Sequence, residues 1–377
     1  MKLHRSFPIA LLTSALALPA TGLGQSVSRA IIVGQSAPLT GSNRQLGEDI
    51  RNGTLACFKR VNDAGGVSGR KLELVTLDDG NDPKRAEANT RTLIEESRAV
   101  VLFGYASSTL SQPALPLIEA AKIGLVAPFT GSVSWRKFNR FVYLHRASVA
   151  DELEKIVEHY TTFGIKRFAV LHYDDAAGKE NLIAIEQALK MRGLELVAIA
   201  SVQRKDVDMA PAVAKVLKAT PDVVITTTLY KTSADFIKLA RAQGTGAQFV
   251  STSFAGSSAL AAELGLAGVG VAMAQVVPPP TKASIPIVRE YQGAIQNLLG
   301  KREYSFTSLE AYIAAKMLVE GIRRTGRDVS RDAVMRALDT LHDYDMNGYL
   351  ITLSSTNHNG SKFVDLTILG GDLAFKN

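Results

Sequence analysis

Short apolar segments alternate with segments of helical spacing through the first part of the chain. The β-branched and apolar runs predict strands, and apolar residues three or four positions apart predict helices. The predicted elements are strand 31–34, helix 47–62, strand 71–77, helix 83–96, strand 99–103, helix 111–121 and strand 124–127. Strand and helix follow one another at about 30 residues per unit, which is typical of parallel strands joined by right-handed crossovers.

The same alternation starts again after residue 150. The predicted elements are helix 151–163, strand 167–172, helix 179–192, strand 195–200, helix 209–219, strand 223–227, helix 232–243 and strand 248–251. Val223, Val224 and Ile225 form a continuous apolar run, which suits a strand in a sheet that is covered on both faces. We therefore expect a second open α/β unit.

The last part of the chain departs from this alternation. The predicted elements are strand 269–277, helices 285–299, 308–324 and 331–341, and closing strands 349–353 and 362–369. Such a tail is longer than one domain needs, so we expect the chain to return to the first unit and then to the second.

The expected fold is therefore α/β with two Rossmann-like lobes, each a parallel sheet flanked by helices. The first lobe is expected to hold 26–146 and 278–343, and the second 147–277 and 344–377. Three hinge crossovers near 145–150, 275–280 and 342–348 would join the lobes.

Residues 1–25 read as a secretory signal peptide. Lys2 and Arg5 precede an apolar run over 7–18, and small residues follow over 19–25. An apolar run of this length is too short to span a bilayer, and no later segment is long and apolar enough. We expect cleavage between Ala20 and Ser26, with the bond after Gly24 preferred, and a soluble protein in a bacterial periplasm.

Composition narrows the classes of protein. The chain has 377 residues, of which 46% are hydrophobic and 21% charged, so it is neither disordered nor fibrous. Its formal charge of +7 arises from 43 basic and 36 acidic residues that are interspersed, which does not make a nucleic-acid surface. Cys57 is the only cysteine and lies in a predicted amphipathic helix, so we expect a buried structural thiol.

No enzyme motif is found in the sequence. Gly-x-Ser-x-Gly, His-Glu-x-x-His and the P-loop are absent, and the glycine-rich run 265–270 has the wrong order for a dinucleotide site. His172, Asp174 and Asp175 on one loop are weak evidence for a metal. We expect no catalytic residue, metal or cofactor. An exported enzyme and an adhesive protein remain alternatives. Turnover of a bound compound would indicate the enzyme, and the lack of any ligand would indicate the adhesive protein.

The loops that follow strands are the candidate binding loops, because ligands sit at the carboxyl ends of strands in open α/β sheets. Two of them, 104–109 and 128–132, are rich in hydroxyl and backbone N–H groups that suit a carboxylate. Helix capping by Ser108 or Thr109 is the alternative. In the second lobe, tyrosines at strand ends would form walls around a small ligand, unless they only pack. The candidate residues are Tyr105, Ser107, Ser108, Thr109, Phe129, Thr130, Gly131, Tyr173, Asp175, Tyr230, Ser253 and Phe254.

Short motifs in a fixed order give the chain a family resemblance. They are GQSAPLTG at 34–41, VNDAGGVSGRKL at 61–72, DDGNDP at 78–83, SQPA at 111–114, APFTG at 127–131, RAS at 146–148 and EAY at 310–312. In this order and spacing the chain resembles the type I periplasmic binding proteins of ABC transporters, in the branched-chain-amino-acid family. The resemblance covers nearly the whole chain after the signal peptide.

The resemblance assigns roles to several candidates. It implies that Ser108, flanked by Ser107 and Thr109, binds the ligand carboxylate together with the loop Phe129 to Gly131. It also implies that Tyr230 is an aromatic wall. The family's acidic residue for the ligand ammonium falls at Ser253, which is not acidic. A carboxylate, an amide or an aromatic acid therefore becomes as plausible a ligand as an amino acid, unless Asp174, Asp175 or Glu310 receives the ammonium.

The resemblance also implies a function. The lobes would close on a small amino acid, amide or carboxylate, and the protein, which we expect to be a monomer, would deliver it to an inner-membrane ABC permease. The alternative is a periplasmic receptor of the same fold that senses the ligand for signalling. The family disulfide is missing, because Asn81 and Ser107 stand near its usual positions.

Overall fold

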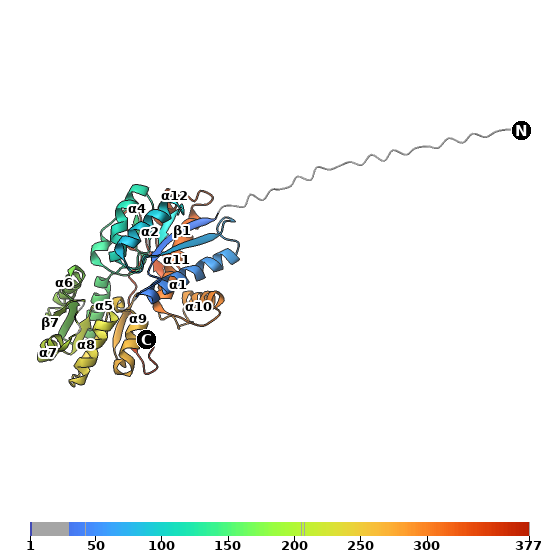
Figure 1. The fold of residues 1–377 in the computed structure, drawn as a ribbon. Coiled ribbons are helices and arrows are strands. Elements are labelled where there is room, and N and C mark those ends of the chain that lie inside the picture. Colours follow the sequence, from blue (N-terminus) through green and yellow to red (C-terminus); the bar gives the residue numbers. More distant parts are fainter. Residues whose placement is uncertain (2–29, 42, 205, 207, 377) are drawn as a thin grey trace.

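Five parallel strands form the first of two large sheets. The computed structural model describes residues 1, 30–41, 43–204, 206 and 208–376, so the predicted signal peptide lies almost entirely outside the described residues (Figure 1). The strands are β1 Ile31–Ala37, β2 Leu72–Asp78, β3 Val101–Phe103, β4 Leu125–Val126 and β5 Val142–Tyr143, in the order β2-β1-β3-β4-β5. The strand β5 was not expected, because two residues are too few to produce a pattern.

Helices cover both faces of the first sheet. The helices are α1 Arg44–Asp63, α2 Pro83–Glu95, α3 Ser108–Ser111, α4 Leu115–Ala121, α10 Pro286–Leu299, α11 Phe306–Arg324 and α12 Arg331–Leu338. One core joins the sheet to α1 and to the three late helices α10, α11 and α12, and another joins it to α2 and α4. Figure 1 shows α10 and α11 beside α1, so the chain does return to its first lobe.

The helix predicted over 111–121 is not continuous. Only its first residue, Ser111, belongs to α3, a 3-10 turn covers Gln112–Ala114, and α4 follows. Pro113 and Pro116 stand at the starts of the last two segments, where the missing proline N–H does least harm. The polar loop after β3 therefore continues into a single helical turn.

The second sheet holds the middle of the chain and its end. Its strands are β6 Phe168–Tyr173, β7 Leu196–Val202, β8 Val223–Thr226, β9 Gln248–Ser251, β10 Ala272–Gln275, β13 Asp365–Leu369 and β14 Phe375–Lys376. The order is β14-β13-β10-β9-β8-β6-β7, in which β6 to β10 are parallel and the two last strands are antiparallel. Burial of both faces explains why its central strands are continuously apolar.

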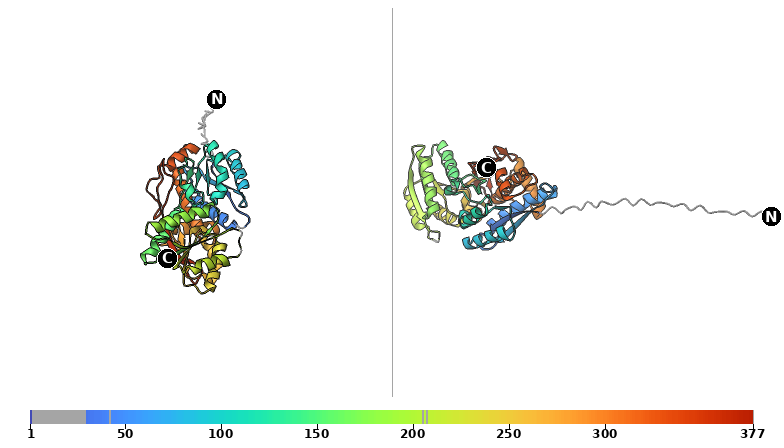
Figure 2. Two further views of the ribbon diagram at one scale, coloured as in Figure 1. Left: turned by 90° about the vertical axis from the view of Figure 1, so that its left-hand side faces the viewer. Right: turned by 90° about the horizontal axis from the view of Figure 1, so that it is seen from above.

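Two layers of helices cover the second sheet. On one face lie α5 Val149–Thr162 and α6 Ala176–Lys190, and on the other lie α7 Ala210–Lys218, α8 Tyr230–Ala242 and α9 Ser257–Leu264. Figure 2 shows the two lobes as separate bodies with the late helices in the first. The glycine-rich run forms a 3-10 turn over Gly265–Gly268, and Cys57 is buried in α1, as expected.

The third crossing between the lobes lies later than predicted. The short hairpin β11 Tyr344–Asp345 and β12 Leu350–Ile351 packs in the core of the first lobe through Met346, Tyr349 and Leu353. The expected boundary at 343/344 is therefore wrong, and the chain crosses between Leu353 and β13. The third crossing also pairs with the first, because Leu144 N donates to His358 O and Gly360 N donates to Leu144 O.

No helix among the described residues is long and apolar enough to span a membrane. Apolar side chains pack in cores between each sheet and the helices that cover it.

The tight packing of α1 on α11 depends on Gly53, and it generates a stability prediction. A Cβ at Gly53 would lie 2.1 Å from Ser308 O and 2.8 Å from Ala311 Cβ. Gly53→Ala should therefore lower the free energy of unfolding by about 1–3 kcal/mol, measured by urea denaturation. Gly293→Ala in α10 is the matched control, because a Cβ there meets nothing within 4 Å. It should raise stability by up to about 1 kcal/mol. Equal changes in the free energy of unfolding for the two substitutions would contradict the close packing of α1 on α11 at Gly53.

Candidate functional site

The loop after β3 ends in a capped turn. Ser107 is the N-cap of α3, and its hydroxyl accepts a hydrogen bond from Leu110 N at 3.2 Å. Ser108 is half-buried and Thr109 is exposed. Neither hydroxyl is hydrogen-bonded to another residue in the part of the chain that the structure describes. Because Ser107 performs the capping, the hydroxyl groups of Ser108 and Thr109 are left available to a ligand.

The side chain of Tyr105 does not belong with these groups. It is fully buried, and its hydroxyl lies 2.8 Å from Thr90 Oγ1. Burial raises the pKa of this phenol well above its usual value, despite the hydrogen bond to Thr90. Tyr105 is therefore a core residue, contrary to the prediction. Its backbone carbonyl accepts from Phe129 N at 2.7 Å and so ties the two candidate loops of the first lobe together.

The loop after β4 lies against the second lobe. Gly131 O accepts from Val149 N, the first residue of α5, at 2.7 Å. A Cβ on Gly131 would lie 2.8 Å from Val149 Cγ2, so only glycine allows this approach. Thr130 is buried, and its hydroxyl accepts from Ser132 N at 3.1 Å. Phe129 is buried too, with its ring 5.1 Å from that of His145.

Arg136, which the sequence analysis did not select, holds this loop in place. Its guanidinium donates to Thr130 O at 3.0 Å, to Arg146 O at 2.8 Å and to Ala147 O at 3.2 Å. Burial lowers the pKa of Arg136 to about 10, and the nearby charge of Arg146 adds to the effect. One side chain therefore binds the candidate loop to the first crossing between the lobes.

A buried ion network lies at that crossing. Arg146 donates to Glu152 Oε1 at 2.9 Å and to Glu310 Oε1 at 3.3 Å, and His145 Nε2 lies 2.8 Å from Glu310 Oε1. Glu310 comes from α11 in the first lobe, and Glu152 comes from α5 in the second. Burial opposes ionisation of Glu310, but Arg146 and His145 outweigh it and lower its pKa. The network joins the two lobes by charge.

Ser253 is part of this network. Its backbone N–H and its hydroxyl donate to the carboxylate of Glu152, each at 2.7 Å, and its hydroxyl oxygen also accepts from Arg146. At the position where the resemblance expects an acidic residue, the second lobe therefore presents a hydroxyl that is bonded to a buried ion pair.

The three carboxylates that could have received a ligand ammonium all have basic partners. Asp174 pairs with Lys179 at 3.0 Å, and Asp175 caps α6 and pairs with Arg204 at 2.8 Å. Glu310 is held in the ion network. Each of the three is therefore already engaged by a basic side chain of the same chain.

The aromatic candidates of the second lobe differ in their surroundings. The hydroxyl of Tyr173 is buried, 2.9 Å from Thr232 Oγ1, and accepts from Leu229 N at 3.2 Å. Tyr230 is the half-buried first residue of α8, and Phe254 is 42% exposed. Tyr230 and Phe254, which follow the carboxyl ends of β8 and β9, thus remain available to contact a ligand. The hydroxyl of Tyr173 is used within its own lobe, where it contacts Thr232 and Leu229.

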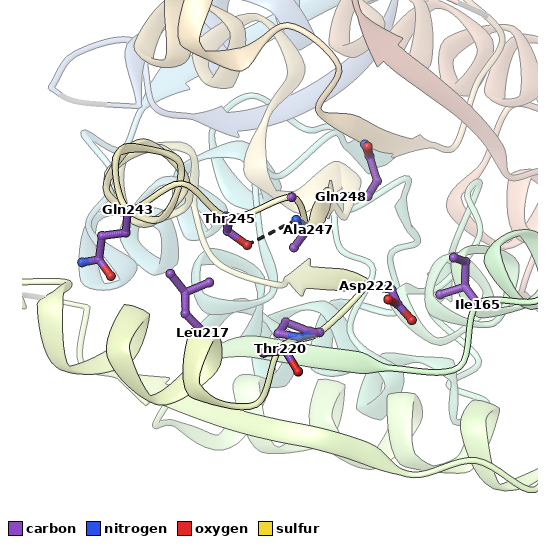
Figure 3. A pocket seen from close by; sticks show the side chains of 10 residues that line it. Ile165, Leu217, Thr220, Asp222, Gln243, Thr245, Ala247 and Gln248 are labelled. Carbon is purple, nitrogen blue, oxygen red and sulfur yellow. Dashed lines mark hydrogen bonds between the residues drawn. The ribbon is translucent and has the colours of Figure 1, made fainter.

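A cavity of about 620 Å³ lies at the amino ends of β8 and β9, away from these loops. Figure 3 shows side chains that line it, among them Leu217, Asp222 and Thr245. Ligands of open α/β sheets bind at the opposite, carboxyl ends. A smaller cavity of about 370 Å³, lined by Tyr173, Asp175 and Arg204, does lie at the carboxyl end of β6. No group of three metal-binding side chains occurs within the described ranges.

Comparison with known proteins agrees with this architecture. The family described as "Periplasmic binding protein" matches residues 30–367. The chain belongs to the periplasmic binding protein family.

Individual relatives extend over most of the chain. An "Amino acid binding protein" of Pseudomonas aeruginosa is 27% identical over 254 residues, which are 66% of either chain. The crystal structure of a possible leucine/isoleucine/valine-binding protein from Rhodopirellula baltica is 28% identical with a TM-score of 0.85, and it covers 93% of this chain and 96% of that one. A substrate-binding periplasmic protein from Ralstonia solanacearum is 31% identical with a TM-score of 0.82, covering 91% and 98%.

The ion network of this periplasmic binding protein generates a prediction. Arg146→Met leaves the buried carboxylates of Glu152 and Glu310 without their cation, so the free energy of unfolding at pH 7 should fall by about 3–5 kcal/mol. Glu310 has a lowered pKa in the folded state, so its stabilising effect is present above its unfolded pKa and is lost as the pH falls through the folded value. Urea denaturation should therefore show that the difference in the free energy of unfolding between wild type and variant becomes smaller toward low pH.

Arg91→Met is the control for this substitution. Arg91 is exposed, and its ion pair with Glu95 on the same helix is long and exposed too, with Nη1 3.7 Å from Oε1. It should change stability by less than about 0.5 kcal/mol. A loss for Arg146→Met that is as small as the control, or that does not depend on pH, would contradict the role of the network.

Proposed function

We propose that this protein is the substrate-binding component of an ABC transporter of the branched-chain-amino-acid type. It binds a small amino acid, amide or carboxylate between its lobes and delivers it to an inner-membrane permease. The observation that carries the proposal is the available hydroxyl group of Ser108 in the loop after β3. The hydrogen bond from Phe129 N to Tyr105 O holds that loop beside the loop Phe129 to Gly131.

The chemistry of these two loops supports a ligand oxygen as the anchor. Hydroxyl and backbone N–H groups donate to a carboxylate or an amide carbonyl, and such bonds are stronger when the acceptor is charged. The names of the Pseudomonas and Rhodopirellula relatives refer to amino acids, which carry a carboxylate. Ser253, bonded to Glu152, offers no free acid, so carboxylates and amides without an amino group belong to the proposed range.

Closure of the lobes completes the proposed site. The chain crosses between the lobes after Tyr143, after Gln275 and after Leu353, and we propose that these crossings act as hinges. Closure would bring Tyr230 and Phe254 of the second lobe over a ligand held on the first. Removal of water strengthens the charge-assisted hydrogen bonds, and a micromolar ligand needs only about −8 kcal/mol in total.

The proposed role also requires that the protein is exported and that it binds its ligand reversibly without converting it. The signal-like composition of 1–25 supports secretion into the periplasm with removal of that segment. The candidate loops offer hydroxyl, amide and aromatic groups, which suit reversible binding.

The ligand class can be found by a thermal-shift screen. The panel holds aliphatic and aromatic amino acids, short amides, urea, dicarboxylates and aromatic carboxylates. A ligand at 100 times its dissociation constant should stabilise the protein by about 2.7 kcal/mol and raise its melting temperature visibly. If no compound of any class shifts the melt and mass spectrometry of the denatured protein finds no retained compound, the proposed function is wrong.

Substitution of Ser108 tests where that compound binds. Ser108→Ala removes a donor to the ligand oxygen, so calorimetry should show binding weaker by about 1–3 kcal/mol. Ser97→Ala is the control. Ser97 lies between α2 and β3, at the amino end of that strand, whereas Ser108 follows its carboxyl end. It should leave the affinity unchanged. Unchanged affinity in Ser108→Ala would remove the loop after β3 from the site.

A further inference from the structure

A hydrogen bond joins the two lobes at a point outside the three crossings. Ser132 Oγ donates to Glu180 Oε2 at 2.9 Å. Ser132 lies in the loop after β4 of the first lobe, and Glu180 lies in the second turn of α6 in the second lobe. The ion network and the bond between Val149 N and Gly131 O lie at or directly beside the first crossing instead. A rotation of the lobes about the crossings therefore changes the contact between Ser132 and Glu180.

The hydroxyl of Ser132 is oriented by its own loop. Ser132 N donates to Thr130 Oγ1 at 3.1 Å, and Ser132 Oγ lies 2.9 Å from Ser134 Oγ. The Ser132 hydroxyl has a single proton, which it donates to Glu180, so Ser134 is the donor in its pair with Ser132. The three groups form a chain of hydrogen bonds from Ser134 through Ser132 to Glu180, in which each bond polarises the next.

The start of α6 holds Glu180 in place on the second lobe. Asp175 is the N-cap of this helix, where it accepts from Gly178 N at 2.8 Å and pairs with Arg204. The carboxylate of Glu180 is half-buried, and a hydrogen bond to a carboxylate is stronger than one between neutral groups. Both partners are therefore held by their own lobes before they meet.

Opening of the lobes breaks this hydrogen bond. Such a bond requires its two oxygen atoms to lie within about 3.0 Å, so a separation of the loop from α6 by a further 1 Å or so removes it. The lobes are in contact in this structure, since Phe306 of α11 packs against the cores of both. Ser132 also directly follows Gly131, the last residue of the loop Phe129 to Gly131 that we propose binds the ligand. Closure and the orientation of that loop thus share one hydrogen bond.

We propose that Ser132 and Glu180 form a latch that sets the balance between the open and closed arrangements of the lobes. Both are positioning residues, which stabilise the closed arrangement and orient the loop Phe129 to Gly131 without touching the ligand. The inference rests on the proposed function, because the closed arrangement is the one that would hold a ligand. Loss of the latch lowers the closed fraction, and the apparent affinity for every ligand falls by the same factor when the open arrangement predominates.

Four substitutions isolate the latch. Ser132→Ala removes the donor, Glu180→Ala removes the acceptor, and Glu180→Gln keeps an acceptor oxygen. Glu186→Ala is the matched control, because Glu186 is an exposed residue of the same helix. Since donor and acceptor belong to one bond, the double variant Ser132→Ala with Glu180→Ala should lose no more than either single variant.

The first measurement is the distance between the lobes of the ligand-free protein, by pulsed electron paramagnetic resonance. Nitroxide labels are placed at Lys84→Cys, at the start of α2, and at Lys231→Cys, at the start of α8. Cys57 stays unlabelled, because it is buried and burial raises the pKa of its thiol to about 12.

The wild type should show a population of short distances, which corresponds to closed lobes. Each alanine variant of the latch should lower the ratio of short to long distances by about fivefold to thirtyfold. Glu180→Gln should keep that ratio within about threefold of the wild type, and Glu186→Ala should leave it unchanged. Rescue by the amide identifies the hydrogen bond, rather than the negative charge, as the stabilising contact.

Calorimetry separates the latch from a direct contact with a ligand. The probes are L-leucine, L-phenylalanine and their desamino acids, 4-methylpentanoate and 3-phenylpropanoate. Every probe that binds the wild type should bind Ser132→Ala and Glu180→Ala more weakly by one common factor, because the latch does not touch the probe. A loss confined to the two amino acids would overturn the latch, since it would require a contact with their amino group.

Other results also decide the matter. The latch is overturned if both alanine variants keep the distance ratio of Glu186→Ala, or if their losses add in the double variant. It is also overturned if the wild type shows no short distances, either alone or with the four probes at millimolar concentration. If the alanine variants open the ligand-free protein but no probe binds or shortens the distance, the latch is supported and the result counts against the proposed function alone.

Discussion

The buried guanidinium of Arg146 is the interaction on which the arrangement of the two lobes depends. It contacts a carboxylate from each lobe and the hydroxyl of Ser253, all in surroundings where an unpaired charge would be strongly unfavourable. Arg136 binds the carbonyl oxygens around it from the other side. The junction is therefore held by directional hydrogen bonds and paired charges.

The same junction explains why the loop after β4 has its particular residues. Gly131 leaves room for the start of α5, and Thr130 uses its carbonyl for Arg136 and its hydroxyl for Ser132. These hydrogen bonds hold the loop in place beside the loop after β3, and we propose that both loops contact the ligand. Loops that are already held in place lose little entropy when a small ligand binds.

Most acidic residues near the junction are engaged by other groups of the same chain. The carboxylate of Glu152 accepts from Ser253 and is neutralised by Arg146. Glu310 completes that network, and Asp174 and Asp175 support the start of α6. Glu180 of α6 accepts a hydrogen bond from Ser132 and has no ion pair with another described residue, and no motif in the sequence marks it, because a single glutamate in an amphipathic helix resembles any other surface residue.

The sequence by itself determined the two α/β lobes, the return of the late helices to the first lobe and the loops that could bind a ligand. Those features follow from local periodicity, caps and strand ends, and Ser107 to Thr109 and Phe129 to Gly131 lie in such loops. Only the tertiary structure decided that the side chain of Tyr105 belongs to the core, that the third crossing lies after Leu353, and that Arg146 joins Glu152 to Glu310. These facts depend on contacts between residues far apart in the chain, for which neighbouring residues carry no periodic signal.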